Sequence, residues 1–354
     1  MSFKTLDPQD FLVSADSITA PCWTGYANPL TAMFTSSVQQ AGTSGNYYLN
    51  VYNTDPSTDT SSEVQFNITY GNYNGSGSLL YNPAIDGLSP TRTIYGQFRN
   101  LIYGDENTSF SFSGVTPVTQ DFYAITIDRA RFKESLFPGT LALTLYSQSQ
   151  AITLTDDSLT ATTVSYCDAG RVFNIISGSN GVVTSTNAPG AVGNGMTISG
   201  SYGLFLPDIG TIILNAAALD LTFANGGINL NTLRTSNSNV NNPVRLYSTG
   251  SNKIGLTTGS LTSSFSLNSQ ETITSDFVFC RARNAEFNYT ENPSFISGST
   301  GAVLYDLFIN SPTTYITTVG LYNDSNELLA VAKLSKPLKK DFTKEALVRV
   351  KLDF

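Results

Sequence analysis

The apolar residues of this chain come in short runs of strand length, and this feature most constrains its fold. The segment 63–70, EVQFNITY, has Val, Phe, Ile and Tyr at alternate positions with polar residues between them. This is the period of a strand with one buried face. β-branched and aromatic residues dominate the other runs, and clusters of Gly, Asn and Ser separate them. The pattern predicts an all-β protein with several antiparallel, sandwich-like β domains, long Ser/Thr/Asn/Gly-rich loops and little helix.

The individual runs predict where most of the elements lie. Residues 90–103 have apolar positions with helical spacing and predict one amphipathic helix. The sequence AAAL at 216–219 adds one helical turn. Strands are predicted at 47–53, 63–70, 122–127, 140–146, 151–154, 171–176, 202–206, 211–214 and 219–223.

Length and composition indicate more than one domain. The chain has 354 residues, of which 13% are charged, and it contains 18 Tyr and 21 Phe. Such an aromatic content supports packed cores, and this length exceeds one simple core. Shifts in composition predict an N-terminal β domain at 1–146 with a candidate packing arm, a low-charge middle β domain at 147–270, and a C-terminal β docking module at 271–354.

The last module reads as a hairpin followed by a third strand. Two apolar runs at 315–322 and 327–334 flank the turn-forming residues NDSN. Pro337 and the lysines around it are expected to break the chain before a further strand at 346–354. A two-stranded hairpin alone is marginally stable, so the module needs a third strand or a partner.

The same end of the chain is basic. Residues 333–354 contain seven Lys or Arg and three acids, on a chain whose formal net charge is −8. The lysines either dock an acidic neighbour or protect an exposed sheet edge from aggregation. Nucleic acid is disfavoured as a partner because the whole chain is acidic. Trp23, the single tryptophan, is a core or interface anchor. The candidate docking residues are Tyr315, Leu321, Lys336, Lys339, Lys340, Arg349, Lys351 and Trp23.

Several classes of chemistry are excluded because the chain has no histidine. Ser-His-Asp and Cys-His nucleophiles, HExxH proteases and most catalytic zinc sites need that residue. No GxSxG, P-loop or GxGxxG motif is present. We therefore predict no enzyme activity and no catalytic, cofactor-binding or metal site. The three cysteines are far apart and are expected to be simple buried thiols. No secretory signal or membrane-spanning run is predicted.

Three stretches carry a resemblance to a known family. DAGRVFNIISGSNG, SYGLFLPDIGTIILN and the ending from FVFCRARNAEFNYTENPSF to AKLSKPLKKDF resemble virion structural proteins of T4-like contractile-tailed phages, particularly those of aquatic, cyanophage-like groups. The hairpin TTVGLYNDSNELLAVAKL is similar to a pattern of tail-fibre collar and baseplate-associated proteins, in which IGLYD precedes a short turn and LVAVA. The resemblance covers most of the chain from about residue 150, and it implies a place in the particle without any catalytic residue.

The resemblance and the composition lead to one expected function and two alternatives. We expect a phage virion structural protein, a tail or baseplate component that docks neighbouring subunits. Its partners are then other virion proteins and copies of itself, and it is located in the virion after assembly in the host cytoplasm. The first alternative is a receptor- or glycan-binding tail fibre or adhesin with a host surface glycan as partner. The second is a depolymerase that works through two carboxylates.

Overall fold

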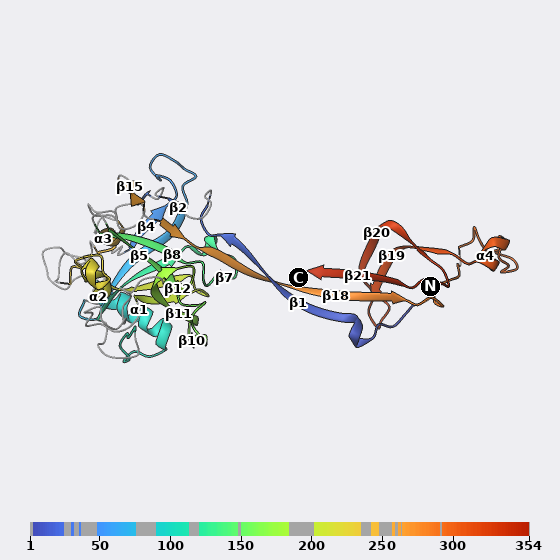
Figure 1. The fold of residues 1–354 in the computed structure, drawn as a ribbon, viewed down its shortest axis with the longest axis horizontal. Coiled ribbons are helices and arrows are strands. Elements are labelled where there is room, and N and C mark those ends of the chain that lie inside the picture. Colours follow the sequence, from blue (N-terminus) through green and yellow to red (C-terminus); the bar gives the residue numbers. More distant parts are fainter. Residues whose placement is uncertain are drawn as a thin grey trace. The chain divides into compact units, whose positions relative to one another are not determined.

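The chain folds into two compact units, shown in the computed structural model of Figure 1. Unit 1 comprises Met1–Ser17 and Thr272–Phe354, and unit 2 comprises Ile18–Glu271. The strands β1 (Phe11–Pro21) and β18 (Asn268–Ala282) each begin in one unit and end in the other. The structure describes residues 3–24, 30–31, 35–36, 48–75, 90–112, 120–147, 150–183, 202–234, 242–247, 257–258, 261–262, 264–290 and 292–353.

Unit 2 is built on one large antiparallel sheet, which confirms the all-β prediction. Its strand order is β2-β17-β8-β9-β11-β13-β14-β6-β5-β4-β3, with β10 and β12 also paired to β11. The strands of this sheet are β2 (Leu30–Thr31), β3 (Thr35–Ser36), β4 (Tyr48–Tyr52), β5 (Val64–Asn72), β6 (Asp121–Ile127), β8 (Ala142–Ser147), β9 (Gln150–Asp156), β10 (Ser165–Cys167), β11 (Gly170–Ser179), β12 (Val182–Val183), β13 (Gly203–Leu206), β14 (Thr211–Asn215) and β17 (Ser264–Ser266). The short strand β7 (Ser135–Leu136) pairs with β18, and β15 (Thr257–Thr258) pairs with β16 (Leu261–Thr262).

The helices of unit 2 are few. The predicted helix is confirmed as α1 (Thr91–Tyr103), and it ends at Gly104, whose φ of 60° suits a glycine. The predicted turn is confirmed as α2 (Ala216–Asp220). The strand predicted at 219–223 is wrong, because Asn215 caps α2 by accepting a hydrogen bond from the Ala217 N–H and turns the chain into a helix. The remaining elements are η2 (Arg129–Arg131), η3 (Phe223–Asn225) and α3 (Asn242–Tyr247).

The large sheet carries an apolar core on each face. Along β6, Phe122 and Ala124 belong to the cluster that also contains the apolar side of α1, whereas Tyr123 and Ile125 belong to a second, larger cluster. The two clusters alternate along the strand because successive side chains of a strand point to opposite faces. The central strands are therefore buried on both sides, not on one.

This arrangement corrects one predicted domain boundary. The division at 146/147 falls in the hairpin of β8 and β9, which pair directly. Moreover, β6 of the expected N-terminal domain pairs with β14 of the expected middle domain. The composition shift along the sequence therefore reflects two parts of one sheet. The predicted boundary at 271 lies beside the observed one, since unit 1 resumes at Thr272.

Unit 1 contains two small antiparallel sheets among its described residues. One has the order β1-β18-β21, and the other is the hairpin of β19 and β20. The elements confined to this unit are η1 (Pro8–Asp10), α4 (Asp306–Asn310), β19 (Thr314–Tyr322), β20 (Leu328–Lys340) and β21 (Ala346–Asp353). The predicted third strand is β21, and it pairs with β18 along Ser275–Ala282.

The break expected at Pro337 is wrong, because β20 continues to Lys340. Ile316 of β19 pairs with Leu338, whereas Thr318 pairs with Lys333. Residues 334–337 therefore form a bulge between these two pairs. A proline is tolerated there because a bulge leaves its residues out of the regular ladder of hydrogen bonds.

Candidate docking surface

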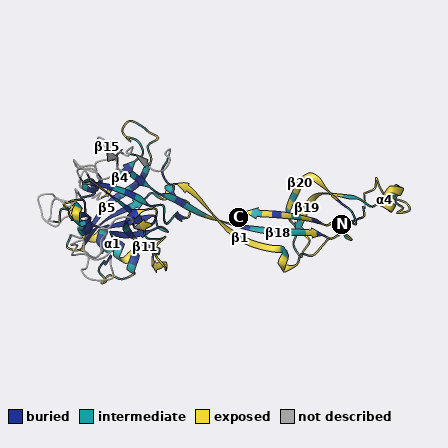
Figure 2. Cartoon of the chain, in the orientation of Figure 1, coloured by how far each residue is buried: buried dark blue, intermediate teal, exposed yellow. Residues whose placement is uncertain are grey.

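Unit 1 has an unusually small apolar core. Among the described residues, it contributes four of the buried hydrophobic side chains, Val278, Ala282, Ala346 and Val350, against 44 in unit 2. It also contributes 18 of the 26 large hydrophobic side chains that are exposed. Figure 2 shows much of β1 and of the β19–β20 hairpin in the colour of exposed residues. Large exposed apolar surface of this kind marks a site of interaction.

One face of the hairpin carries most of the candidate site. We call it the outer face and define it by Tyr322, Leu328, Val331 and Lys333. Val331 is paired opposite Gly320, Leu328 opposite Tyr322, and Lys333 opposite Thr318. Gly320 has no side chain, and Tyr322 and Leu328 extend over it, since a Cβ built there would lie 2.9 Å from the Tyr322 ring. Leu328 is 51% exposed and Val331 58%. The outer face is thus an apolar strip with one lysine.

Three predicted docking residues are exposed elsewhere on the same hairpin. Tyr315 and Lys339 are paired opposite each other, beyond the bulge, and Lys336 is exposed in the bulge that follows Lys333. Lys339 Nζ lies 4.0 Å from Asp341 Oδ2, which is a weak, exposed ion pair. Leu321, also predicted, lies on the opposite face, where it pairs with Ala330 and is half-buried. It supports the hairpin from within unit 1.

Arg349 and Lys351 lie on β21, on a different surface from the hairpin's outer face. Their side chains cover the ring of Phe277 on the neighbouring strand β18, at 5.2 Å and 5.9 Å from its centre. Lys351 also pairs with Asp353 at 2.9 Å. The hydrogen bond from Ser275, followed by that from Lys351, holds the pKa of Asp353 below its usual range. Both cations are exposed but have partners within the chain.

The docking role predicted for Lys340 is wrong, because this residue cannot contact a partner. Its side chain is fully buried, and its Nζ donates to the Asn284 carbonyl at 3.1 Å and to Asn288 Oδ1 at 2.8 Å. The alternation of β20 turns Lys340 inward, next to Lys339, which turns outward. A run of lysines in the sequence does not reveal which of them faces the core.

The docking role predicted for Trp23 is also wrong. It is 3% exposed and lies in the larger core of unit 2, where its ring packs on Phe66 and Phe265. Its Nε1 donates to the Phe265 carbonyl at 2.9 Å. Of the two roles considered for it, Trp23 therefore has the core role. Cys22 beside it is also buried, which raises the pKa of its thiol to about 12.

The structure adds apolar residues that were not among the predicted site. Leu328, Leu329 and Val331 are 51%, 68% and 58% exposed, and Phe11, Leu12 and Val13 of β1 are 53%, 54% and 67% exposed. A signal exists in the sequence, since ELLAVAKL and FLV place apolar residues at consecutive positions. Consecutive apolar positions on a strand require cover on both faces, which a small unit does not provide.

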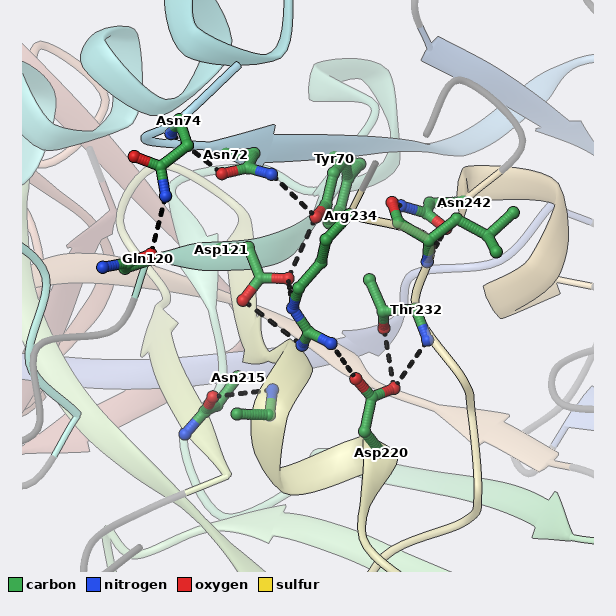
Figure 3. Close-up of polar contacts among 12 residues, drawn as sticks. Tyr70, Asn72, Asn74, Gln120, Asp121, Asn215, Asp220, Thr232, Arg234 and Asn242 are labelled. Atoms are coloured by element: carbon green, nitrogen blue, oxygen red, sulfur yellow. Dashed lines mark hydrogen bonds and ion pairs between the residues drawn. The ribbon is translucent and has the colours of Figure 1, made fainter. Parts of the chain in front are cut away.

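A partly buried cluster of charged and polar side chains in unit 2 is the second candidate site (Figure 3). Arg234 Nε lies 2.8 Å from Asp121 Oδ2, and its Nη1 lies 2.7 Å from Asp220 Oδ2. Tyr70 also donates to Asp121 Oδ2, at 2.9 Å, and the Thr232 N–H and hydroxyl both donate to Asp220 Oδ1 at 2.8 Å. The cluster joins β5, β6 and α2 to the segment that follows η3.

The properties of the cluster are those of an interaction that stabilises the fold. Burial raises the pKa of Asp121, and the guanidinium of Arg234 and the hydroxyl of Tyr70 oppose this effect. Burial lowers the pKa of Arg234, but the two carboxylates outweigh it and the net change is upward. Asp121 Oδ2 and Asp220 Oδ1 each accept two hydrogen bonds within the chain, which leaves little capacity for a substrate. A two-carboxylate depolymerase would need both groups on the substrate.

In the part of the chain that the structure describes, no group of three or more Cys, Asp or Glu side chains lies close enough together to hold a metal ion. No helix among the same residues is long and apolar enough to cross a bilayer.

No protein-family model matches the chain, and comparisons with curated proteins and with solved structures find no match.

Proposed function

We propose that this chain is a structural component of a phage particle, in its tail or baseplate, that works by docking on neighbouring subunits. The observation that carries the proposal is the imbalance in unit 1, with four buried hydrophobic residues against 18 large exposed ones among the described residues. So small a core leaves most of the large apolar side chains of this unit in contact with water unless another surface covers them. Another protein surface is the natural source of that cover.

The resemblance to virion structural proteins supports the same proposal from a separate direction. Two of the three resembling stretches correspond to the central strands β11, β13 and β14, and the third includes the β19–β20 hairpin. The similarity thus involves both the scaffold of unit 2 and the surface that we assign to docking. Other virion proteins and copies of the same chain are the partners that this role requires.

Purified phage particles provide the test. We expect peptides of this chain in gradient-purified particles by mass spectrometry, in several copies per particle. Cryo-electron microscopy of those particles should then show the hairpin of unit 1 covered by a neighbouring subunit. Absence of the chain from particles that contain the other structural proteins would overturn the proposal.

A receptor- or glycan-binding role is the second candidate. Tyr166 favours it, because this side chain lies in the short hairpin of β10 and β11 and is 74% exposed. Exposed aromatic rings suit sugar binding as well as protein contacts. The middle loops that motivate this alternative, at 184–201, 235–241 and 248–256, lie outside the described residues. Tyr166→Ala should reduce binding of the purified chain to host cells if this role holds, and unchanged binding would argue against it.

A further inference from the structure

We infer that unit 1 completes its core with a second copy of the same chain, in which β1 of one copy docks against the outer face of the β19–β20 hairpin of the other. The inference deepens the proposed function and rests on it, because it names the partner of the same surface. Three properties of the described residues carry it: matched apolar strips, opposite charges and unpaired strand edges.

The first property is that both strands are apolar and bare. Phe11, Leu12 and Val13 are consecutive in β1, and all three are more than half exposed. Because neighbouring side chains of a strand point to opposite faces, β1 lacks cover on both of its faces. The outer face of the hairpin presents Leu328 and Val331 with similar exposure. Each strip therefore has the kind of surface that the other needs.

The second property is the opposite charge of the two strips. Within unit 1, β1 carries the exposed Asp16 and no base, and Asp10 immediately precedes the strand. The strand β20 carries Lys333, Lys336 and Lys339 as exposed residues and contains no acid. Opposite charges beside an apolar strip favour one orientation of the two strands and speed their encounter. A second copy supplies both the acidic and the basic strip in equal number.

The third property is the position of these strands at sheet edges. The order β1-β18-β21 leaves β1 with one unpaired edge among the described residues, and the hairpin forms a two-stranded sheet of its own. Long unpaired edges that carry apolar side chains invite another chain. The lysines and Pro337 of β20 are typical of an edge that is protected against pairing with another chain. The exposed Leu328, Leu329 and Val331 of the same strand are apolar and do not protect it.

The geometry of the contact defines what assembly results. A strip on one copy that binds a different strip on the next is a head-to-tail contact, which gives a ring when the rotation between neighbours closes and an open filament when it does not. If the same two copies exchange both contacts, the result is a two-fold dimer. Either assembly gives each hairpin one β1 strand as cover.

The test uses the purified full-length chain and measures its mass in solution by light scattering coupled to size-exclusion chromatography. We expect a defined oligomer. The double substitution Leu328→Asp with Val331→Asp should shift it to the monomer, because charges replace the apolar centre of the strip. Leu159→Asp is the matched control, since Leu159 is a 67% exposed leucine of unit 2 and belongs to neither strip. This control should retain the oligomer.

A charge exchange tests the specific pairing of β1 with β20. Asp16→Lys and Lys333→Glu should each weaken the oligomer, because each places like charges across the contact. A mixture of the two variants should regain part of the association, because the Lys of one variant now faces the Glu of the other. If Lys333→Glu weakens the oligomer and Asp16→Lys does not, the hairpin binds something other than β1 and the inference is overturned.

The outcome for self-association is separate from that for the proposed function. A wild-type chain that is monomeric at every accessible concentration, yet present in purified particles, overturns this inference and leaves the structural role in place. An oligomeric chain that is absent from particles overturns the structural role and supports the self-association. Circular dichroism of each variant shows that it is folded, so loss of the oligomer is not a consequence of unfolding.

Discussion

At the scale of single residues, burial changes the energetic cost of a charge in this chain. Asp121 and Arg234 would be ordinary surface residues by their sequence context, and neither was predicted to matter. In the structure the Asp121 side chain is 6% exposed and Arg234 compensates it. An uncompensated buried carboxylate is costly, so the arginine stabilises unit 2 mainly by preventing that cost.

Arg234→Met should therefore destabilise unit 2 by about 2 kcal/mol at neutral pH, less than for a fully buried pair because the Arg234 side chain is 44% exposed. Urea unfolding followed by tryptophan fluorescence measures this, because Trp23 lies in the core of the same unit. Adding Asp121→Asn to the variant should recover part of the loss, since it removes the buried charge. Equal stability of the single and double variants would contradict this account.

The same variant should depend on pH in a defined direction. Burial raises the pKa of Asp121, and loss of Arg234 raises it further. A carboxyl with a raised folded-state pKa favours the folded state when it is protonated, and this contribution is lost as the pH rises through that pKa. The cost of Arg234→Met should thus shrink as the pH falls toward about 4, near the ordinary pKa of Asp. A cost that is constant from neutral to acid pH would argue against the buried charge as its cause.

Lys340 provides a second prediction, with its neighbour as control. Its Nζ holds the loop that contains Phe287, whose φ of 51° is rare for a residue with a side chain. Lys340→Met should leave Asn288 Oδ1 without its donor, whereas Asn284 O keeps the hydrogen bond from Asn288 Nδ2, and the loss should cost about 2 kcal/mol of the stability of unit 1. Lys339→Met should change it little, because Lys339 is exposed. Calorimetry of the two variants decides this, and similar melting temperatures would show that the buried contacts contribute nothing.

At the scale of elements, alternation in the sequence was a sound guide to strands, and helical spacing was a sound guide to α1. The errors occur where local side-chain chemistry or register intervenes. Asn215 caps a helix that the apolar run 219–223 does not suggest. Pro337 sits in a bulge, so β20 passes through it. Neither the cap nor the bulge follows from hydrophobic periodicity, because both depend on which backbone groups lie opposite each other.

Substitution of two glycines distinguishes the effect of close packing on stability from the effect of backbone freedom. A Cβ at Gly203 in β13 would lie 1.7 Å from the Ile213 carbonyl oxygen on β14, whereas a Cβ at Gly96 in α1 meets nothing within 4 Å. Gly203→Ala should cost about 3 kcal/mol through forced displacement of a paired strand. Gly96→Ala should add about 1 kcal/mol through helix propensity. Urea denaturation measures both, and a gain in stability for both would show that β13 can move.

At the scale of the whole molecule, the chain order of the two units has a consequence for folding. Unit 2 is one continuous segment, whereas unit 1 needs both ends of the chain. We therefore expect residues 18–271 to fold without the rest. In calorimetry of the full chain we expect two transitions, because each unit has its own core.

Deletion of residues 1–17 should abolish or lower the transition of unit 1 and leave that of unit 2 within a few degrees of its original position. The physical reason is that the deletion removes most of β1, an edge strand of the small sheet, and no strand of the large sheet. The comparison requires scans of both proteins under the same conditions. Loss of both transitions together would show that the units do not fold independently.

The sequence by itself determined the class of this protein: strand-length apolar runs, one amphipathic helix, and a basic C-terminal module that needs a partner. These properties are local, because they depend on spacing and residue type within a few positions. Only the tertiary structure decided that residues 18–271 share one sheet, that Trp23 and Lys340 are buried, and that Asp121, Asp220 and Arg234 meet. Those properties depend on which distant strands pair, and strand pairing is specified by the combined burial of both faces of a sheet.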